Sequence, residues 1–154
     1  MDQASAIPFR KMNGLGNDFI VIDRRSRDFV MDEEKARALA SRETGIGCDQ
    51  LIVLDKSDIA DVKMRIWNNG GGEVESCGNA SRCIADLLFA ETGGESATID
   101  TKGGFLSAHK AGDKLVTVDM GAPKFGWQDI PLSEPFADTR HVELQVGPID
   151  APLI

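Results

Sequence analysis

The chain has 154 residues, 42% of them hydrophobic and 27% charged, a composition typical of a globular protein that can build one core. Its 17 Lys and Arg against 25 Asp and Glu give a formal net charge of −8, which argues against non-specific nucleic-acid binding because that needs a positive face. No apolar run approaches the roughly 20 residues that span a bilayer. The first residues also lack the basic start and apolar block of a signal peptide, so we expect a cytoplasmic protein with no membrane or nucleic-acid partner.

The first half of the chain predicts strands on either side of one helix. The expected elements are strands at 9–12 and 19–23, a helix from Asp32 to about Arg42, and strands at 51–54 and 62–67. The glycine-rich segment 13–18 is expected to form the turn between the first two strands. It is a weak candidate for a phosphate loop, because it lacks a Gly-Lys-Ser/Thr ending and no helix follows it. Asp32 fits an N-cap, and Gly45 lies just past the expected helix end.

The second half predicts a buried helix and then strands. The segment 80–90 is apolar on nearly every side, and such a helix must be enclosed by other elements. Strands are expected at 97–101, 105–110, 115–120 and 141–146, with a hairpin turn at 111–113 and a loop at 123–135. The order of elements predicts an α+β fold, in which a curled mixed or antiparallel sheet wraps around a central buried helix.

The cysteine pattern favours neither a disulfide framework nor a metal site. The three cysteines, Cys48, Cys77 and Cys83, are odd in number, and a reducing compartment is expected. The two histidines, His109 and His141, lie far in sequence from the cysteines and from each other, so no pair of ligands has the short spacing of a zinc site. We expect no metal and no organic cofactor.

Cys77 is the candidate catalytic residue, because it stands where a turn enters the buried helix. The first N–H groups of a helix have no partner within the helix, and the helix dipole places partial positive charge there. Both effects favour an anion, either the thiolate of Cys77 or a substrate carboxylate. Gly78 leaves room for such a ligand. The alternative is that Cys77 is a small buried apolar residue, as most free cysteines are; that is what we expect of Cys48 and Cys83.

Four amide side chains stand beside glycines or at the ends of expected elements: Asn17, Gln50, Asn68 and Asn79. Amides offer neutral donors and acceptors that can fix an amino group or a carboxylate. Taken singly, each is more often a turn residue than a ligand contact.

Four motifs occur together and in one order: KMNGLGNDF at 11–19, GIGCDQ at 45–50, RIWN at 65–68 and SCGNASRC at 76–83. Together they resemble the N-terminal half of the diaminopimelate epimerase family, cofactor-independent isomerases of bacterial lysine and cell-wall synthesis. The resemblance runs from about Phe9 to Met120. There are two departures, Asn69-Gly70-Gly71-Gly72 in place of Ala-Asp-Gly-Ser and Ala80-Ser81-Arg82 in place of Gly-Ala-Arg. We expect the first to loosen a loop and the second to add a methyl near the helix start.

The resemblance implies a protein of two similar lobes with the active site in the cleft between them. Residues 1–154 would then be the N-terminal lobe, and the absent C-terminal lobe would carry the second catalytic cysteine. Cys77 matches the first catalytic cysteine, and the substrate contacts carry over to Asn17, Gln50, Asn68, Gly78 and Asn79. The implied substrate is diaminopimelate, interconverted between its LL and meso forms by two-cysteine acid/base proton transfer. The full-length protein is expected to be a homodimer.

Two alternatives stay open. One is another racemase of the same fold, of the proline or hydroxyproline type, and the other is a binding fragment without chemistry. The chain by itself is expected to be inactive, because one lobe supplies only one wall of the cleft.

Overall fold

The computed structural model describes residues 6–130 and 132–142. The chain divides into two compact units, one up to Met120 and one from Gly121 onward. Every described helix and strand lies in the first unit. In the second, the described residues form turns and loops, as expected for 123–135, with a hydrogen bond of 2.5 Å from Thr139 Oγ1 to the Phe125 carbonyl. The strand expected at 141–146 is absent at 141–142, and its other residues lie outside the described part.

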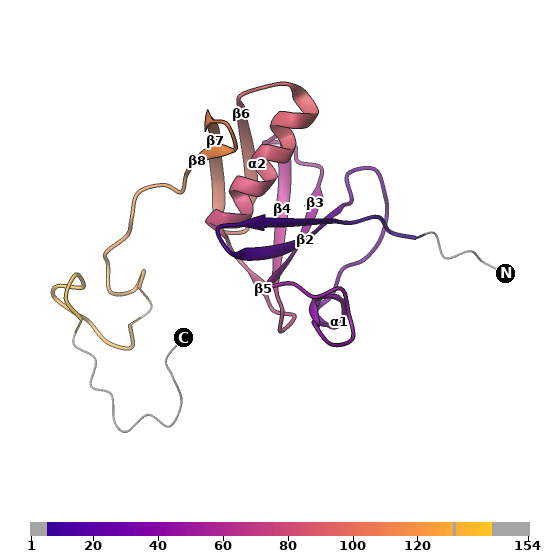
Figure 1. Ribbon diagram of the computed structural model, residues 1–154. Helices are drawn as coiled ribbons and strands as arrows, with labels where there is room; N and C mark the ends of the chain where they lie inside the picture. Colours follow the sequence, from indigo (N-terminus) through magenta and orange to yellow (C-terminus); the bar gives the residue numbers. More distant parts are fainter. Residues whose placement is uncertain (1–5, 131, 143–154) are drawn as a thin grey trace. The chain divides into compact units, whose positions relative to one another are not determined.

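The first unit is built on one eight-stranded mixed sheet (Figure 1). Its strands are β1 Arg10–Gly14, β2 Asn17–Asp23, β3 Gln50–Asp55, β4 Val62–Asn68, β5 Glu73–Val74, β6 Ser96–Thr101, β7 Gly104–Gly112 and β8 Leu115–Asp119. They lie in the order β1-β2-β3-β4-β6-β7-β8, with the short β5 paired to β4. The β2/β3 and β4/β6 pairs are parallel and the others antiparallel, which confirms the predicted mixed sheet.

The two helices, α1 Glu33–Ala40 and α2 Gly78–Thr92, pack against opposite faces of the sheet. Side chains of a strand point alternately to its two faces. Phe19 and Val21 of β2 accordingly pack in the larger core with α2, and Ile20 and Ile22 pack in the smaller core with α1. Because both faces of β2 and β3 are covered, these strands are continuous apolar runs rather than alternating ones.

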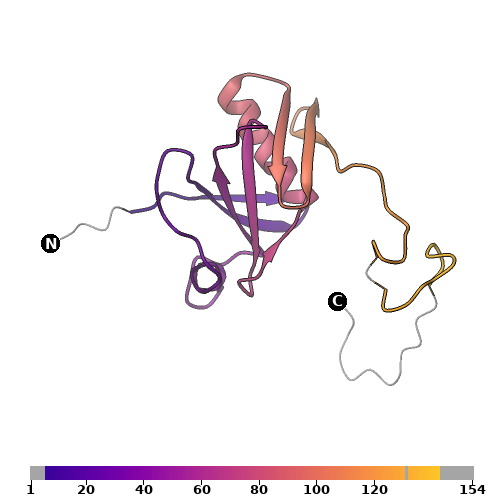
Figure 2. The ribbon, with the colours of Figure 1, turned by 180° about the vertical axis from the view of Figure 1, so that it is seen from behind.

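The sheet curls around α2. Strands β1 and β8 are the two edges of the sheet, yet both contact α2, as do β6 and β7. Seen from behind, the magenta to orange strands cover the helix (Figure 2). The α2 side chains that fill the resulting core are Ala80, Cys83, Ile84, Ala85, Leu88 and Phe89. The predicted central buried helix is therefore confirmed, although it begins two residues earlier and ends two later than expected.

The first helix ends at Ala40 instead of about Arg42. Its N-cap is Asp32, as predicted, which accepts a hydrogen bond of 2.9 Å from the Lys35 N–H. At the C-terminal end, the N–H of Ile46, in the loop that follows the helix, donates to the Leu39 carbonyl. This hydrogen bond replaces the one that would continue the helix, so Arg42 lies outside it.

Two smaller differences concern strands. The hairpin turn expected at 111–113 lies at Asp113-Lys114, because a register shift between Lys110 and Gly112 lengthens β7. The two-residue β5 was missed, since a strand of that length has no pattern to detect.

Candidate functional site

Three of the four predicted amides lie at one end of the sheet, on three neighbouring strands. Asn17 is the first residue of β2, Gln50 is the first of β3, and Asn68 is the last of β4. Phe19 pairs with Gln50 in the parallel ladder, and Gln50 pairs with Asn68 in the antiparallel one. Strand pairing therefore brings together residues that are up to 51 positions apart in the sequence.

The same three amides also share a face. Each stands two residues from a side chain of the core that encloses α2, namely Phe19, Ile52 and Ile66. Since residues two apart on a strand point the same way, all three amides are on the α2 face of the sheet. Asn17 and Gln50 are half-buried and Asn68 is exposed.

Cys77 is the N-cap of α2, with the extended backbone (φ −152°, ψ 113°) that a cap requires. Its side chain is half-buried and makes no capping hydrogen bond, so it leaves the first N–H groups of the helix available. Gly78 follows. The nearest heavy atom to a Cβ built there would be Met120 Sδ at 3.9 Å, outside the neighbouring residues and the helix's own first turns. Packing therefore does not require a glycine at this position. The space in front of it suits a ligand.

Side-chain hydrogen bonds join the amides in two pairs. Asn79 Nδ2 donates to Asn17 Oδ1 at 2.5 Å, which ties the start of α2 to the start of β2. Arg82, three residues further along the helix, donates to Asn79 Oδ1. Gln50 Nε2 donates to Asn68 Oδ1 at 3.0 Å. The structure thus brings the predicted Asn17 together with Asn79, and Gln50 together with Asn68.

The β1–β2 turn packs directly on the start of α2. Leu15 and Gly16 form a two-residue turn with φ values of 51° and 94°, the conformation that suits a hairpin. A Cβ on Gly14 would lie 3.0 Å from both the Asn79 carbonyl oxygen and Cys83 Sγ. The glycine segment is therefore a hairpin turn that approaches a helix closely, as the plain-turn interpretation predicted.

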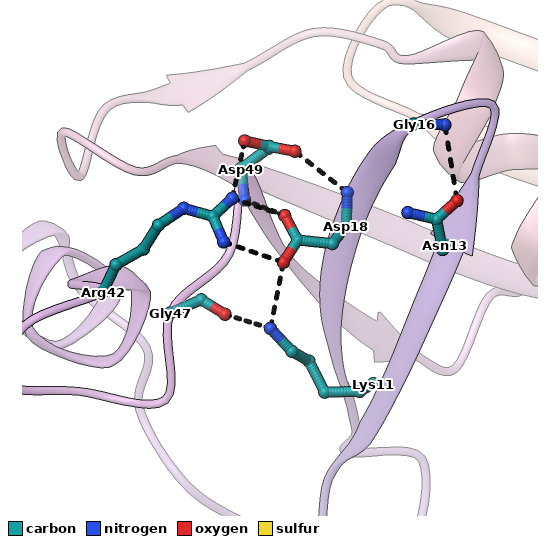
Figure 3. A network of polar contacts seen from close by, with 7 residues as sticks. All are labelled: Lys11, Asn13, Gly16, Asp18, Arg42, Gly47 and Asp49. Carbon is teal, nitrogen blue, oxygen red and sulfur yellow. Dashed lines mark hydrogen bonds and ion pairs between the residues drawn. The ribbon is translucent and has the colours of Figure 1, made fainter.

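A charged network lies on the other face of the sheet, beside the amides (Figure 3). Asp18 and Asp49 bond to each other's backbone, with Asp18 N–H to Asp49 Oδ2 at 2.9 Å and Asp49 N–H to Asp18 Oδ1 at 3.1 Å. Arg42 donates to both carboxylates, at 2.6 Å to Asp18 Oδ1 and 2.9 Å to Asp49 Oδ1. Lys11 Nζ lies 3.0 Å from Asp18 Oδ2 and also donates to the Gly47 carbonyl.

This network clamps the residues next to two of the amides. Asp18 follows Asn17 and Asp49 precedes Gln50, so the clamp fixes the spacing between the starts of β2 and β3. The Arg42 guanidinium, helped by Lys11, holds the pKa of Asp18 well below its usual range. Sequence reasoning assigned these charges no role. Their only signal was that two carboxylates stand inside glycine motifs, next to candidate contacts.

The other two cysteines are core residues. Cys48 and Cys83 are buried free thiols, and burial raises the pKa of each. The loop after Asn68 was expected to be loosened by its departure from the family pattern, and that expectation is wrong. Arg37 Nε of α1 donates to the Gly70 carbonyl at 2.8 Å, and Gly71 lies so close to α1 that a Cβ there would be 2.5 Å from the Glu33 carbonyl oxygen. The second departure adds a methyl near the start of α2, as expected, and Ala80 buries it in the core.

Among the described residues, no three or more His, Cys, Asp or Glu side chains are grouped as a metal site would need. No described helix is both long and apolar enough to cross a membrane.

Two epimerases of known structure share this curled mixed sheet around one helix over part of their length. A predicted epimerase of Pseudomonas aeruginosa aligns with a TM-score of 0.58 at 21% identity, covering 79% of this chain and 45% of that one. A hydroxyproline epimerase of Agrobacterium vitis aligns with a TM-score of 0.57 at 15% identity, covering 77% and 42%. These likenesses define the class of fold.

The family follows from sequence. The family model of diaminopimelate epimerase matches residues 9–126, and the chain belongs to that family. It is 50% identical over 149 residues to the diaminopimelate epimerase of Acidiphilium cryptum, covering 97% of this chain and 53% of the relative. It is 49% identical over 144 residues to that of Phenylobacterium zucineum, covering 94% and 52%. The chain thus spans about half the length of these curated relatives.

Proposed function

We propose that residues 1–154 form the N-terminal lobe of a two-lobed diaminopimelate epimerase. The observation that carries the proposal is the convergence of Asn17, Gln50 and Asn68 on one face and one end of the sheet. The hydrogen bond from Asn79 to Asn17 brings the start of α2, with Cys77 as its N-cap, to the same place. Family membership supports the proposal. The enzyme would interconvert LL- and meso-2,6-diaminopimelate in the cytoplasm, within lysine and peptidoglycan synthesis.

Cys77 is the acid/base group of this lobe in the proposal. Inversion at a carbon needs a base on one face and an acid on the other, and one thiolate with one thiol meets that need. In one direction Cys77 removes the α-hydrogen, and in the other it delivers the proton. Its support is its half-buried place at the N-cap beside Gly78, which sets it apart from buried Cys48 and Cys83.

The substrate groups would be held by the helix start and the amides. The first N–H groups of α2 can bind the α-carboxylate, whose negative charge the helix dipole favours. Such contacts stabilise the carbanion that forms when the α-hydrogen leaves, which matters because the proposed reaction uses neither metal nor organic cofactor. Asn17, Gln50, Asn68 and Asn79 supply the donors and acceptors that orient the substrate.

The rest of the cleft would come from a second lobe. We propose that this lobe, reached beyond Ile154, carries the second cysteine, and that the full-length protein is a homodimer. A closed cleft excludes water and strengthens every charge contact inside it.

The test is isotope exchange in the protein that carries both lobes. Incubation with LL-diaminopimelate in deuterated water should give the meso form with deuterium at the inverted carbon. Parallel incubations with proline and hydroxyproline should show no exchange. Exchange with those substrates alone would point to another racemase of this fold, and binding of diaminopimelate without exchange would point to a module without chemistry.

A further inference from the structure

We propose that Arg82 is a positioning residue that sets which way round the amides of Asn79 and Asn17 lie, so that Asn17 offers its NH₂ group to the substrate. The inference rests on the proposed function and goes beyond it. It concerns a residue that touches no substrate in the proposal and acts through two others.

The argument begins with the guanidinium group. An arginine side chain has N–H donors and no acceptor, whereas an asparagine amide has one oxygen that accepts and one NH₂ that donates. The only atom of the Asn79 amide that Arg82 can bond is therefore Oδ1, and that is the contact present. With Oδ1 held by Arg82, Nδ2 must point the other way.

The constraint then passes to Asn17. Asn79 Nδ2 faces Asn17 and donates to its Oδ1 at 2.5 Å. Asn17 is thereby turned so that its own Nδ2 is directed away from this bond. Through these two hydrogen bonds, Arg82 on α2 fixes the orientation of the Asn17 amide, so that its NH₂ group is a defined donor at the start of β2. A donor at that point attracts a carboxylate, and an amide turned over would present a carbonyl oxygen that repels one.

Arg82 is well placed for this role. It is half-buried and stands three residues after Asn79, so both side chains share a helix face. Among the described residues, no carboxylate lies within ion-pair distance of Arg82. Asp86 stands one turn further along α2 and lines a surface pocket together with Arg82. Within the described part of the chain, the hydrogen bond to Asn79 is not shared with an ion pair.

The other amide pair provides an internal comparison. Gln50 Nε2 donates to Asn68 Oδ1, but in the described part of the chain no arginine or lysine bonds to either amide. That pair keeps its orientation for reasons unrelated to Arg82. A change at position 82 should therefore alter the Asn17–Asn79 pair alone.

The test uses three substitutions that differ in hydrogen-bond character. Arg82→Lys keeps a donor without an acceptor, Arg82→Met removes the polar group and keeps the apolar stem, and Arg82→Glu replaces donors by acceptors. Lys114→Met and Lys114→Glu are matched controls, because Lys114 lines the same 440 Å³ pocket and changes the local charge without touching the amides. Folding of each variant is checked by its thermal unfolding.

The first readout is the side-chain amide NMR spectrum of the 154-residue chain. Nuclear Overhauser contacts from the Asn79 NH₂ protons should run to Asn17 in the unchanged chain and in Arg82→Lys. In Arg82→Glu they should run to residue 82, and the Gln50 signals should stay in place throughout. The same contacts to Asn17 in Arg82→Glu as in the unchanged chain would overturn the proposal.

The second readout is epimerisation of diaminopimelate by the protein with both lobes. Losing one hydrogen bond to a charged group should lower kcat/KM roughly 10- to 100-fold in Arg82→Met, mostly through KM. Arg82→Glu should lose more, Arg82→Lys should recover most of the loss, and both Lys114 controls should resemble the unchanged protein. Equal losses in Arg82→Lys and Arg82→Met would contradict the role. If the unchanged protein epimerises nothing, the proposed function fails, and the NMR readout still decides the orientation.

Discussion

At the scale of single residues, burial separates the three cysteines. Cys77 is half-buried at the helix start, while Cys83 is 8% exposed within the α2 core. In the protein with both lobes, Cys77→Ala should abolish epimerisation with little change in stability. Cys83→Ala should keep activity and lower the free energy of unfolding by about 1 kcal/mol, since it empties a small buried volume.

Turnover assays and urea unfolding of the two variants check this prediction together. Cys77→Ala should change turnover and not stability, and Cys83→Ala should change stability and not turnover. Each variant is therefore the control for the other. Near-normal turnover in Cys77→Ala would remove Cys77 from the mechanism.

The Asp18 carboxylate predicts a pH dependence of stability. Its hydrogen bond with Arg42 lowers its pKa in the folded state, relative to about 3.9 in an unfolded chain. A lowered folded pKa means that this contribution is complete above the unfolded value and is lost as the pH falls through the folded one. The free energy of unfolding of the unchanged chain should therefore drop below about pH 4.

Asp18→Asn is the comparison, because it keeps the shape and loses the titration. Its stability should be lower near neutral pH and should change less between about pH 5 and pH 2. Other carboxylates with a lowered pKa, such as Glu73 beside Arg65, titrate in the same way in both proteins, so their contributions cancel in the comparison. Parallel curves for the two proteins would show that the Asp18 bonds do not stabilise the fold.

The sequence could nominate the amides but could not foresee the clamp. Asn17, Gln50 and Asn68 stand at element ends, which pattern analysis can locate. Asp18 and Arg42 look like ordinary charges of solvated turns, and their bonds join segments 24 residues apart. Local pattern contains no information about such pairings.

At the scale of elements, the approach of the β1–β2 hairpin to α2 depends on Gly14. A side chain there would meet a backbone carbonyl and Cys83 Sγ, each at 3.0 Å. Gly14→Ala should push the hairpin off the helix and lower the free energy of unfolding by about 1–3 kcal/mol, the usual cost of overpacking. Because Asn17 directly follows the turn of the same hairpin, substrate binding in the protein with both lobes should weaken as well.

Gly72→Ala is the matched control, since a Cβ at Gly72 would have no neighbour within 4 Å. Its effect should stay within about 0.5 kcal/mol. The double variant Gly14→Ala/Cys83→Ala should lose less than the sum of its single changes, because one of the two contacts is removed. Strict additivity in urea unfolding would contradict the packing argument.

Element types were predictable where apolar pattern was long, and element ends were not. The α2 core face follows from its sequence, but its start at Gly78 lies outside the apolar run. The end of α1 depends on Ile46 N–H reaching the Leu39 carbonyl, and the turn after β7 depends on a register shift. Each is a contact of the folded chain rather than a property of the segment.

At the scale of the whole molecule, the curl of the sheet explains how the first unit can enclose α2 by itself. The edges β1 and β8 both reach α2, so the helix is enclosed without help from another lobe. The start of α2 and the amides lie at the end of the sheet, where the helix emerges from that enclosure. The core around α2 is therefore complete within this unit, whereas the proposed site lies at the edge of that core.

The 154-residue chain alone should consequently fold cooperatively and yet fail to epimerise diaminopimelate. With one wall of the cleft, a substrate carboxylate meets one helix end in water, where such a contact is worth about 1 kcal/mol or less. In the proposed mechanism the proton-transfer group for the opposite face lies on the second lobe, and one positioned group contributes roughly 10²–10⁴-fold. Unfolding followed by circular dichroism should show a single transition. Incubation of the folded chain with LL-diaminopimelate in deuterated water should show neither exchange nor inversion above the buffer rate, and inversion by this chain would mean that Cys77 needs no partner.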